Sequence, residues 1–327
     1  MSASTLAAAG RRLPQRFLPV VATVVVFLVT FGIGSVRYQD FASGQVVANL
    51  FIDNAFLIVL AVGMTFVILT GGIDLSVGAV AALSTMIAAA TLRAGWPPLL
   101  AVLAVLAVGT VLGLLMGLVI HYFDVQPFIV TLAGMFLARG LCFLISVESV
   151  SIDNTAFRDF ATGTFVLPGD VTVTYSVVVA LLVVAAGAYV LHLTRFGRTV
   201  YAVGGSESSA RLMGLPTTAA KVGVYAVSGL CSALGGLLFA LYMLSGYGLH
   251  AVGMELDVIA AVVIGGTLLS GGVGYVAGST AGVLVLGTVQ ALISFEGTLS
   301  SWWTKIVIGA LLLAFIVLQR LIVRQRR

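Results

Sequence analysis

The chain has 327 residues, of which 60% are hydrophobic and only 9% are charged, and its mean hydropathy is +1.17. Soluble domains carry about 25% charged residues, and a soluble protein of this size has too little interior to hide so much apolar surface. The composition excludes a soluble globular enzyme, a disordered chain and a collagen-like fibre, and the long unbroken apolar runs exclude a barrel of short alternating strands. It predicts an all-α polytopic membrane protein.

About ten transmembrane helices are predicted, because ten apolar segments approach the length of about 20 residues that a spanning helix needs. Very short Gly-rich turns join the second segment to the third and the eighth to the ninth, so either pair allows a broken or half-length helix. The first segment has no small-residue cleavage site, which favours an uncleaved helix over a signal peptide. The ten segments are 17–36, 46–69, 73–92, 98–120, 127–146, 173–193, 222–244, 255–270, 273–293 and 302–320.

The positions of Lys and Arg predict the orientation, because cytoplasmic loops carry an excess of both. With ten spans, all three basic regions fall on one side, so both termini are expected in the cytoplasm. Acidic residues collect on the opposite side, mainly in the loop 147–172. The basic residues are Arg11, Arg12 and Arg16, then Arg195, Arg198, Arg211 and Lys221, then Arg320, Arg324, Arg326 and Arg327.

The expected organisation is one membrane domain, 17–320, between a cytoplasmic tail, 1–16, and a basic cytoplasmic tail, 321–327. Its largest connections are a cytoplasmic loop, 194–221, and a periplasmic loop, 147–172. Neither is predicted to form a water-soluble module.

The sequence lacks the motifs of several functional classes, which narrows the set of functions to consider. Neither Lys221 nor Lys305 belongs to a G-x-x-x-x-G-K-[ST] loop, so the sequence predicts no ATP bound by a P-loop. His121, His192 and His250 are far apart, which argues against a metal site, and no Ser-His-Asp pattern suggests an enzyme. The sequence favours a transport subunit that binds no cofactor or nucleic acid and is energised by another subunit.

A weak internal repeat has the pattern G-G-x-x-L-S-x-G. Paired Gly-interrupted apolar segments in two halves of a chain often mark a transport site, although chance is a competitor in a chain so rich in Gly and Leu. The glycines allow a helix to break and offer free N–H groups. The first copy, 71–78, contains Gly71, Gly72, Asp74 and Ser76, and the second, 265–272, contains Gly265, Gly266 and Ser270.

Asp74 and Arg139 are charged residues at membrane depth, where charges are costly and usually functional. For Asp74 a helix cap or structural pivot is favoured over substrate contact, and a proton relay is the weakest alternative. Arg139 is expected either to face the interior or a wet cavity, near an acidic group or a sugar hydroxyl, or to snorkel to an interface. These two alternatives are evenly balanced.

Uncharged polar residues in or beside the apolar helices suit a pathway for a neutral polyol better than one for an ion. Interhelical hydrogen bonding remains the favoured role for any one of them. They are Asn54, Thr65, Thr70, Gln126, Thr131 and Gln290.

The 194–221 loop contains a predicted short helix from Ser206 to Met213. Ser206 is a good N-cap and Gly214 a good stop, while Glu207 and Arg211 complement the helix dipole. Such a helix lies on the lipid surface or docks into a groove of a soluble partner, and the resemblance described below favours the partner. The candidate docking residues are Gly204, Gly205, Ser206, Glu207, Ala210, Arg211, Met213 and Gly214.

Three stretches, 62–78, 194–214 and 263–274, resemble the permease subunits of bacterial ribose/galactose-type ATP-binding-cassette (ABC) sugar importers. The resemblance runs over nearly the whole chain. Three further stretches, 53–57, 131–136 and 297–306, are most similar to the permeases of galactofuranose importers. The loop has Ser206 where the family often has Asn, a change that should affect helix capping only slightly.

The resemblance implies an inner-membrane subunit that pairs with a second permease chain, a paralogue, above a cytoplasmic ABC ATPase and below a periplasmic sugar-binding protein. The 206–213 helix would be the coupling helix that docks on the ATPase. The expected cargo is galactofuranose or a related monosaccharide. The alternatives are another sugar such as ribose or galactose, an ion-coupled secondary carrier and, least favoured, a membrane-embedded enzyme.

Overall fold

The computed structural model describes residues 18–298, 300 and 302–324. The described chain is mainly helical, with two small antiparallel sheets. The helices are α1 Leu18–Arg37, α2 Gly44–Ile52, α3 Ala55–Leu69, α4 Val77–Arg93, α5 Pro98–Tyr122, α6 Pro127–Ile145, α7 Thr155–Thr162, α8 Tyr175–Leu193, α9 Arg195–Gly205, α10 Glu207–Leu212, α11 Thr217–Met243, α12 Met254–Ile264, α13 Val276–Glu296 and α14 Trp302–Arg324.

Each of the ten predicted segments contains a helix, but helix lengths do not confirm ten membrane spans. Within the described residues, six helices are long and apolar enough to cross a membrane, and α2 with α3 makes a seventh if this pair, bent by 56°, counts as one span. The helix α12 has 11 residues and is about 16 Å long, about half of a hydrocarbon core. The helix α4 has 17 residues and follows irregular chain, and α14 counts among the shorter apolar helices over its stretch Trp302–Val317.

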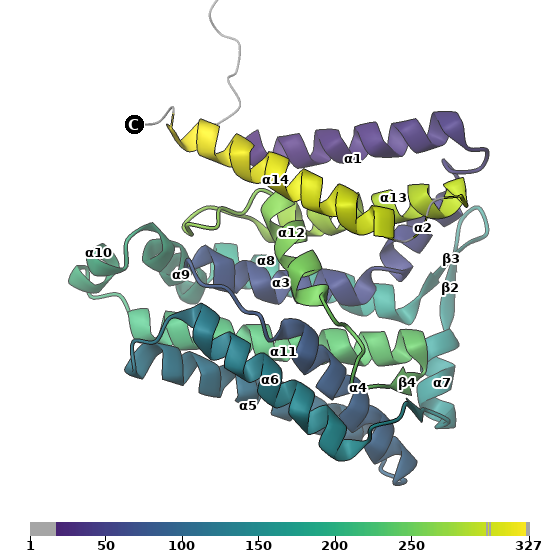
Figure 1. Ribbon diagram of the computed structural model, residues 1–327, viewed down its shortest axis with the longest axis horizontal. Helices are drawn as coiled ribbons and strands as arrows, with labels where there is room; N and C mark the ends of the chain where they lie inside the picture. The colour runs from purple at the N-terminus through teal and green to yellow at the C-terminus, as the bar shows by residue number, and fades with distance from the viewer. Residues whose placement is uncertain (1–17, 299, 301, 325–327) are drawn as a thin grey trace, which may run out of the picture.

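The helices run mostly along the long axis of the molecule (Figure 1). At one end, on the left of the view, lie α9 and α10, together with the start of α1 and the end of α14. At the other end lie α7 and the four strands. The predicted loops 194–221 and 147–172 are therefore at opposite ends. Residues 1–17 and 325–327, which hold most of the predicted tails, fall outside the described residues.

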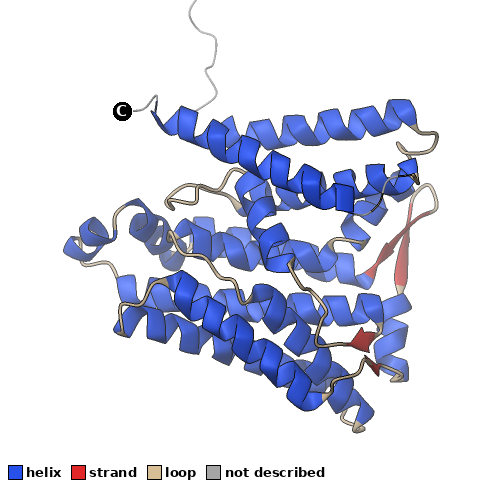
Figure 2. Ribbon diagram, in the orientation of Figure 1, coloured by secondary structure: helices blue, strands red, loops and turns tan. Residues whose placement is uncertain are grey.

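The 147–172 region is more structured than a loop, and its strands depart from the all-α prediction (Figure 2). β2 Thr164–Leu167 and β3 Val171–Thr174 form a hairpin, in which Gly169 and Asp170 take the positive φ values that a tight turn needs. β1 Val150–Ser151 pairs with β4 Ser245–Gly246, so the region is tied to the chain just after α11.

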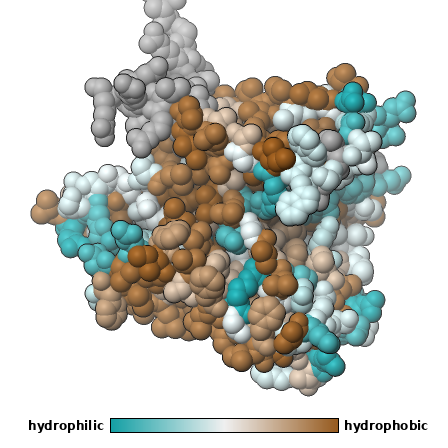
Figure 3. Space-filling model, viewed as in Figure 1, coloured by the Kyte–Doolittle hydropathy of each residue, from teal (hydrophilic) through white to brown (hydrophobic). Residues whose placement is uncertain are grey.

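The core is built around α3 and α11. All but one residue of α3 is buried, and α11 packs on α3, α4 and α5. Glycines let α5 and α11 approach closely, because a Cβ on Gly113 would overlap the backbone of α11 at Tyr225 and Gly229. The outward sides of α1, α5, α6, α8 and α14 carry exposed apolar side chains, which suit contact with lipid. Brown, apolar residues cover much of the face shown in Figure 3.

Candidate translocation and coupling sites

Both copies of the glycine repeat end a helix in the same way. After α3, Gly71 has φ 79° and the N–H of Gly72 donates to the carbonyl of Val67 at 3.2 Å. After α12, Gly266 has φ 90° and the N–H of Thr267 donates to the carbonyl of Val262, also at 3.2 Å. This is the Schellman cap, in which a left-handed glycine closes the last helical turn.

The turns that follow the two caps contact each other. The N–H of Gly272 donates to the carbonyl oxygen of Leu69 at 2.9 Å, and Gly71 lies against the carbonyl of Ser270. Gly204, near the end of α9, completes the junction, because a Cβ on this residue would overlap Leu69 and Gly272. The two repeat copies and the residues just before α10 therefore form one glycine junction.

Asp74 is fully buried in the irregular segment between α3 and α4. The Oδ1 of Asp74 accepts hydrogen bonds from the backbone N–H of Ser76 at 2.9 Å and from the hydroxyl of Ser76 at 2.6 Å. Its Oδ2 accepts from the hydroxyl of Ser228 on α11 at 2.7 Å. The N-cap of α4 is Ser76 rather than Asp74. Asp74 thus fastens the irregular segment to α11.

Other predicted pathway residues are also buried and bonded within the protein. The hydroxyl of Thr65 on α3 donates to that of Ser279 on α13 at 2.7 Å. Thr131 on α6 lies 3.3 Å from the carbonyl of Ile73. Thr65, Asp74, Ser76 and Thr131 are at most 1% exposed, so they hold helices together in this conformation and line no open space.

Arg139 on α6 holds the segment that leads into α12. Its Nη1 donates to the carbonyl oxygens of Gly248 and His250, both at 2.6 Å. This segment and the start of α12 also meet α4, because a Cβ on Gly78 would lie 2.7 Å from the carbonyl oxygen of Ala251 and 2.5 Å from Oε2 of Glu255. Arg139 therefore contacts backbone at the entrance of the half-length helix, and forms no ion pair within the described chain.

Sequence reasoning missed the partners of these residues. Ser228 donates the buried hydrogen bond to Asp74, and Ser279 accepts the one from Thr65. The buried hydroxyl of Tyr225 lies next to Gly72. The only signal in the sequence is a polar residue within an apolar helix, a signal shared by many positions. Within the described chain no three His, Cys, Asp or Glu side chains gather as metal ligands.

The predicted cytoplasmic helix is α10, where local capping signals place it. The hydroxyl of Ser206 accepts from the N–H of Ser209 at 3.3 Å, and Gly214, with φ 73°, ends the helix. Ala210 is buried against the protein, whereas Leu212 and Met213 are 90% and 67% exposed. An exposed apolar pair on a short capped helix is suited to contact another protein.

Glu207 fixes α10 to the rest of the chain. Its carboxylate lies 2.6 Å from Nζ of Lys221 on α11 and 3.1 Å from Nη2 of Arg211. Burial raises the pKa of Glu207, but the hydrogen bond and charge of Lys221 and the charge of Arg211 more than offset this effect, so the pKa lies below its ordinary value. Glu207 is therefore ionised at neutral pH and keeps both partners.

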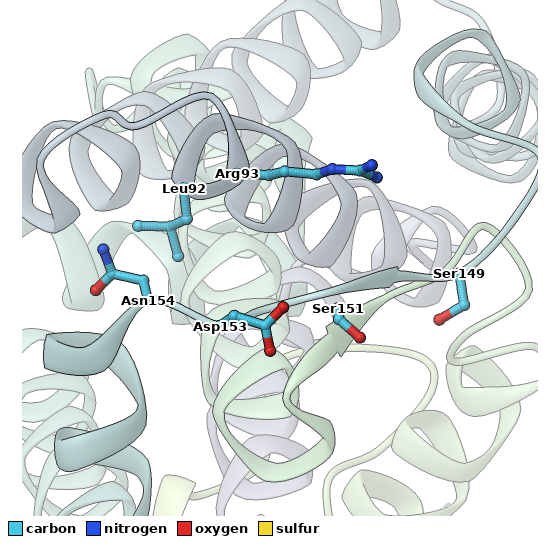
Figure 4. A pocket seen from close by; sticks show the side chains of 6 residues that line it. All are labelled: Leu92, Arg93, Ser149, Ser151, Asp153 and Asn154. Atoms are coloured by element: carbon cyan, nitrogen blue, oxygen red, sulfur yellow. The ribbon is translucent and has the colours of Figure 1, made fainter.

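A polar cavity of about 520 Å³ lies at the opposite end of the molecule. Figure 4 shows Arg93 and Leu92 from α4 on one side, and Ser151, Asp153 and the neighbouring polar residues on the other. Asp153 is also 3.7 Å from Arg158 on α7. The surface around this cavity carries charged groups of both signs, and it lies far from α10.

The comparisons with known proteins agree with this architecture. Residues 46–316 match the family described as a branched-chain amino acid transport system permease component. The inner membrane ABC transporter permease protein YjfF of Escherichia coli is 46% identical over 94% of this chain and 93% of its own length. The fructose import permease protein FruG of Bifidobacterium longum is 42% identical, with coverage of 95% and 93%. The ribose import permease protein RbsC of Escherichia coli is 36% identical, with coverage of 95% and 97%. No solved structure matches the chain.

Proposed function

Because the chain belongs to this family of ABC permease components and is a multi-pass inner-membrane protein of sugar transport, we propose that it is the translocating subunit of an importer for a monosaccharide, galactofuranose in the first instance. The relatives named for fructose and ribose import support a monosaccharide. The chain itself hydrolyses nothing. A separate ATPase supplies the energy, and this subunit carries no cofactor.

The glycine junction is the observation that carries this mechanism. Gly204 lies three residues before Glu207, the first residue of α10, and contacts both the end of α3 and the turn after α12. A displacement of α10 by an ATPase therefore reaches both interrupted segments without an intervening flexible loop. Alternating access requires such a link between the energised subunit and the pathway.

The basic end of the molecule, with α9 and α10, is the cytoplasmic end in this proposal. Arg195, Arg198, Arg211 and Lys221 all belong to this end, as the excess of basic residues in cytoplasmic loops requires. Leu212 and Met213 then project toward the ATPase. The end with the strands faces the periplasm and receives a sugar-binding protein, and a second permease chain, a paralogue, completes the pathway.

Uptake by reconstituted vesicles tests the proposal. Proteoliposomes would contain this chain, its candidate paralogue and the ATPase, with binding protein outside and ATP inside, and would be offered labelled galactofuranose. We expect uptake that requires ATP and persists in excess ribose. ATP-dependent uptake that ribose abolishes would replace galactofuranose by another sugar. Uptake driven by a proton or sodium gradient without the ATPase would overturn the importer and establish a secondary carrier.

A further inference from the structure

A large cavity lies at the end of the molecule opposite α10, between the bend joining α2 to α3, the ends of α11 and α13, and the start of α14. Its volume is about 960 Å³, at the upper end of the range of about 300–1,000 Å³ for small-ligand sites. In Figure 3 pale and teal residues interrupt the brown surface near the start of α14. The cavity thus opens in a polar region of an otherwise apolar protein.

The lining combines amides, a carboxylate and aromatic rings. Asn54 and Gln290 can each donate and accept hydrogen bonds, and Asp53 accepts them. Phe56, Tyr242 and Trp302 provide ring faces. Sugar hydroxyls both donate and accept, and the C–H faces of a sugar ring pack on aromatic surfaces, so this set of groups matches a monosaccharide.

Some of these groups are held in place and others are free. The Nδ2 of Asn54 donates to the carbonyl of Leu50 at 2.9 Å, and a Cβ on Gly287 would lie 2.5 Å from this nitrogen. Asn54 is therefore fixed against α13, with no hydrogen bond on its Oδ1 from any described residue. Gln290, one turn along α13, is exposed, and its amide has no hydrogen-bond partner among the described residues. Both leave hydrogen-bonding capacity for a ligand.

The charges argue for a neutral ligand. The ammonium group of Lys305 lies 2.6 and 2.8 Å from the two carboxylate oxygens of Asp257, so its charge is already balanced. Asp53 accepts only a 3.4 Å hydrogen bond from Tyr242. The described lining thus offers a carboxylate and no unpaired cation, which disfavours sugar phosphates, sugar acids and the carboxylate of an amino acid.

The geometry points to this cavity as a binding subsite for a neutral monosaccharide at the outer end of the pathway, with Asn54 and Gln290 bonding ring hydroxyls and Trp302 stacking on the ring. The inference deepens the proposed function and takes its orientation from it. It places the contact residues where α2, α13 and α14 meet, away from the buried Asp74.

The first experiment compares Gln290→Ala with Gln39→Ala in the reconstituted importer. Gln39, in the turn after α1, is a matched exposed glutamine that does not line the cavity. We expect Gln290→Ala to raise KM for uptake about tenfold, with little change in maximal rate, since it removes hydrogen bonds to the ligand. Gln39→Ala should change neither quantity. An unchanged KM for Gln290→Ala would overturn the subsite while ATP-dependent uptake by the unaltered importer still upheld the proposed function.

The second experiment measures binding without transport. The chain has three tryptophans, so Trp96→Phe with Trp303→Phe leaves Trp302 as the reporter in the purified full chain. Titration with D-galactose, D-fructose and D-ribose should change its fluorescence saturably for at least one sugar, and Gln290→Ala should weaken that response. L-Leucine should produce none. No response to any of the three sugars, or a response to L-leucine alone, would overturn the assignment whatever the energy source of the carrier.

Discussion

The amide of Gly272 donates a hydrogen bond to the carbonyl oxygen of Leu69, 2.9 Å away, so the turn after α12 is fastened to the end of α3. Gly204 packs on the same two groups. The three segments come from the first half of the chain, the 194–221 connection and the second half. Because the three segments meet at glycines, these glycines, more than any charged residue, connect α10 to both interrupted segments.

The neighbouring glycines of α9 provide a direct test. Gly204→Ala should reduce uptake at least tenfold, because the new methyl group would overlap Leu69 and Gly272 and force the junction apart. Gly205→Ala is the matched control, since no atom lies within 4 Å of its added Cβ. Transport and membrane insertion would be measured for both. Equal activity of the two variants would remove the junction from the mechanism.

Asp74→Asn should reduce uptake and lower the thermal unfolding temperature. Asn keeps one acceptor oxygen but places an NH₂ group where Asp74 has its second acceptor, so one side of the contact with Ser76 and Ser228 is lost, and a buried polar group left without its partner costs about 1–3 kcal/mol. Ser228→Ala should reproduce part of the loss, and the double variant should lose less than the sum of the two. Normal uptake by Asp74→Asn would reduce the residue to a replaceable turn element.

Met213→Asp should uncouple ATP hydrolysis from transport. Met213 is 67% exposed at the end of α10, so a charge there would enter an apolar interface without disturbing the fold. ATPase activity of the assembled importer and sugar uptake would be measured together, with Met213→Leu as the conservative control. Coupled, unchanged transport by Met213→Asp would show that α10 is not the docking helix.

The attachment of α10 through Glu207 should be insensitive to pH over the physiological range. The pKa of Glu207 is lowered, so the stabilisation from its ion pairs is fully present above the ordinary glutamate pKa of about 4.3 and is lost as the pH falls through the lower folded value. Glu207→Gln should loosen α10 at all these pH values. Hydrogen exchange of the α10 amides at pH 5 and pH 7.5 would measure both effects. Faster exchange of the unaltered chain at pH 5, beyond the intrinsic rate, would contradict the assignment.

Local signals predicted local structure well. Ser206 and Gly214 specify α10 because both caps act within a few residues, and the ten apolar runs each contain a helix. The predicted segment 255–270 yields only the 11-residue α12, because Gly266, with φ 90°, ends that helix just after Ile264, and the Gly-rich turn already allows a half-length helix there. The link from Asp74 to Ser228 and that from Arg139 to Gly248 join distant segments. Such links depend on tertiary packing, which the sequence does not reveal.

The pairing of β1 with β4 closes a ring of covalent and hydrogen-bonded chain. From Arg139 the ring runs along α6 to Val150, crosses to Gly246, and returns through Gly248 to the guanidinium group. The strand pair and the Arg139 hydrogen bond fix the number of residues that fit in this ring. Residues added between Ser146 and Ser149 would therefore have to bulge outward or break the pairing. The β2–β3 turn at Gly169, with open space around it, is under no such constraint. An inserted epitope or reporter peptide therefore belongs at Gly169, where it leaves the ring intact.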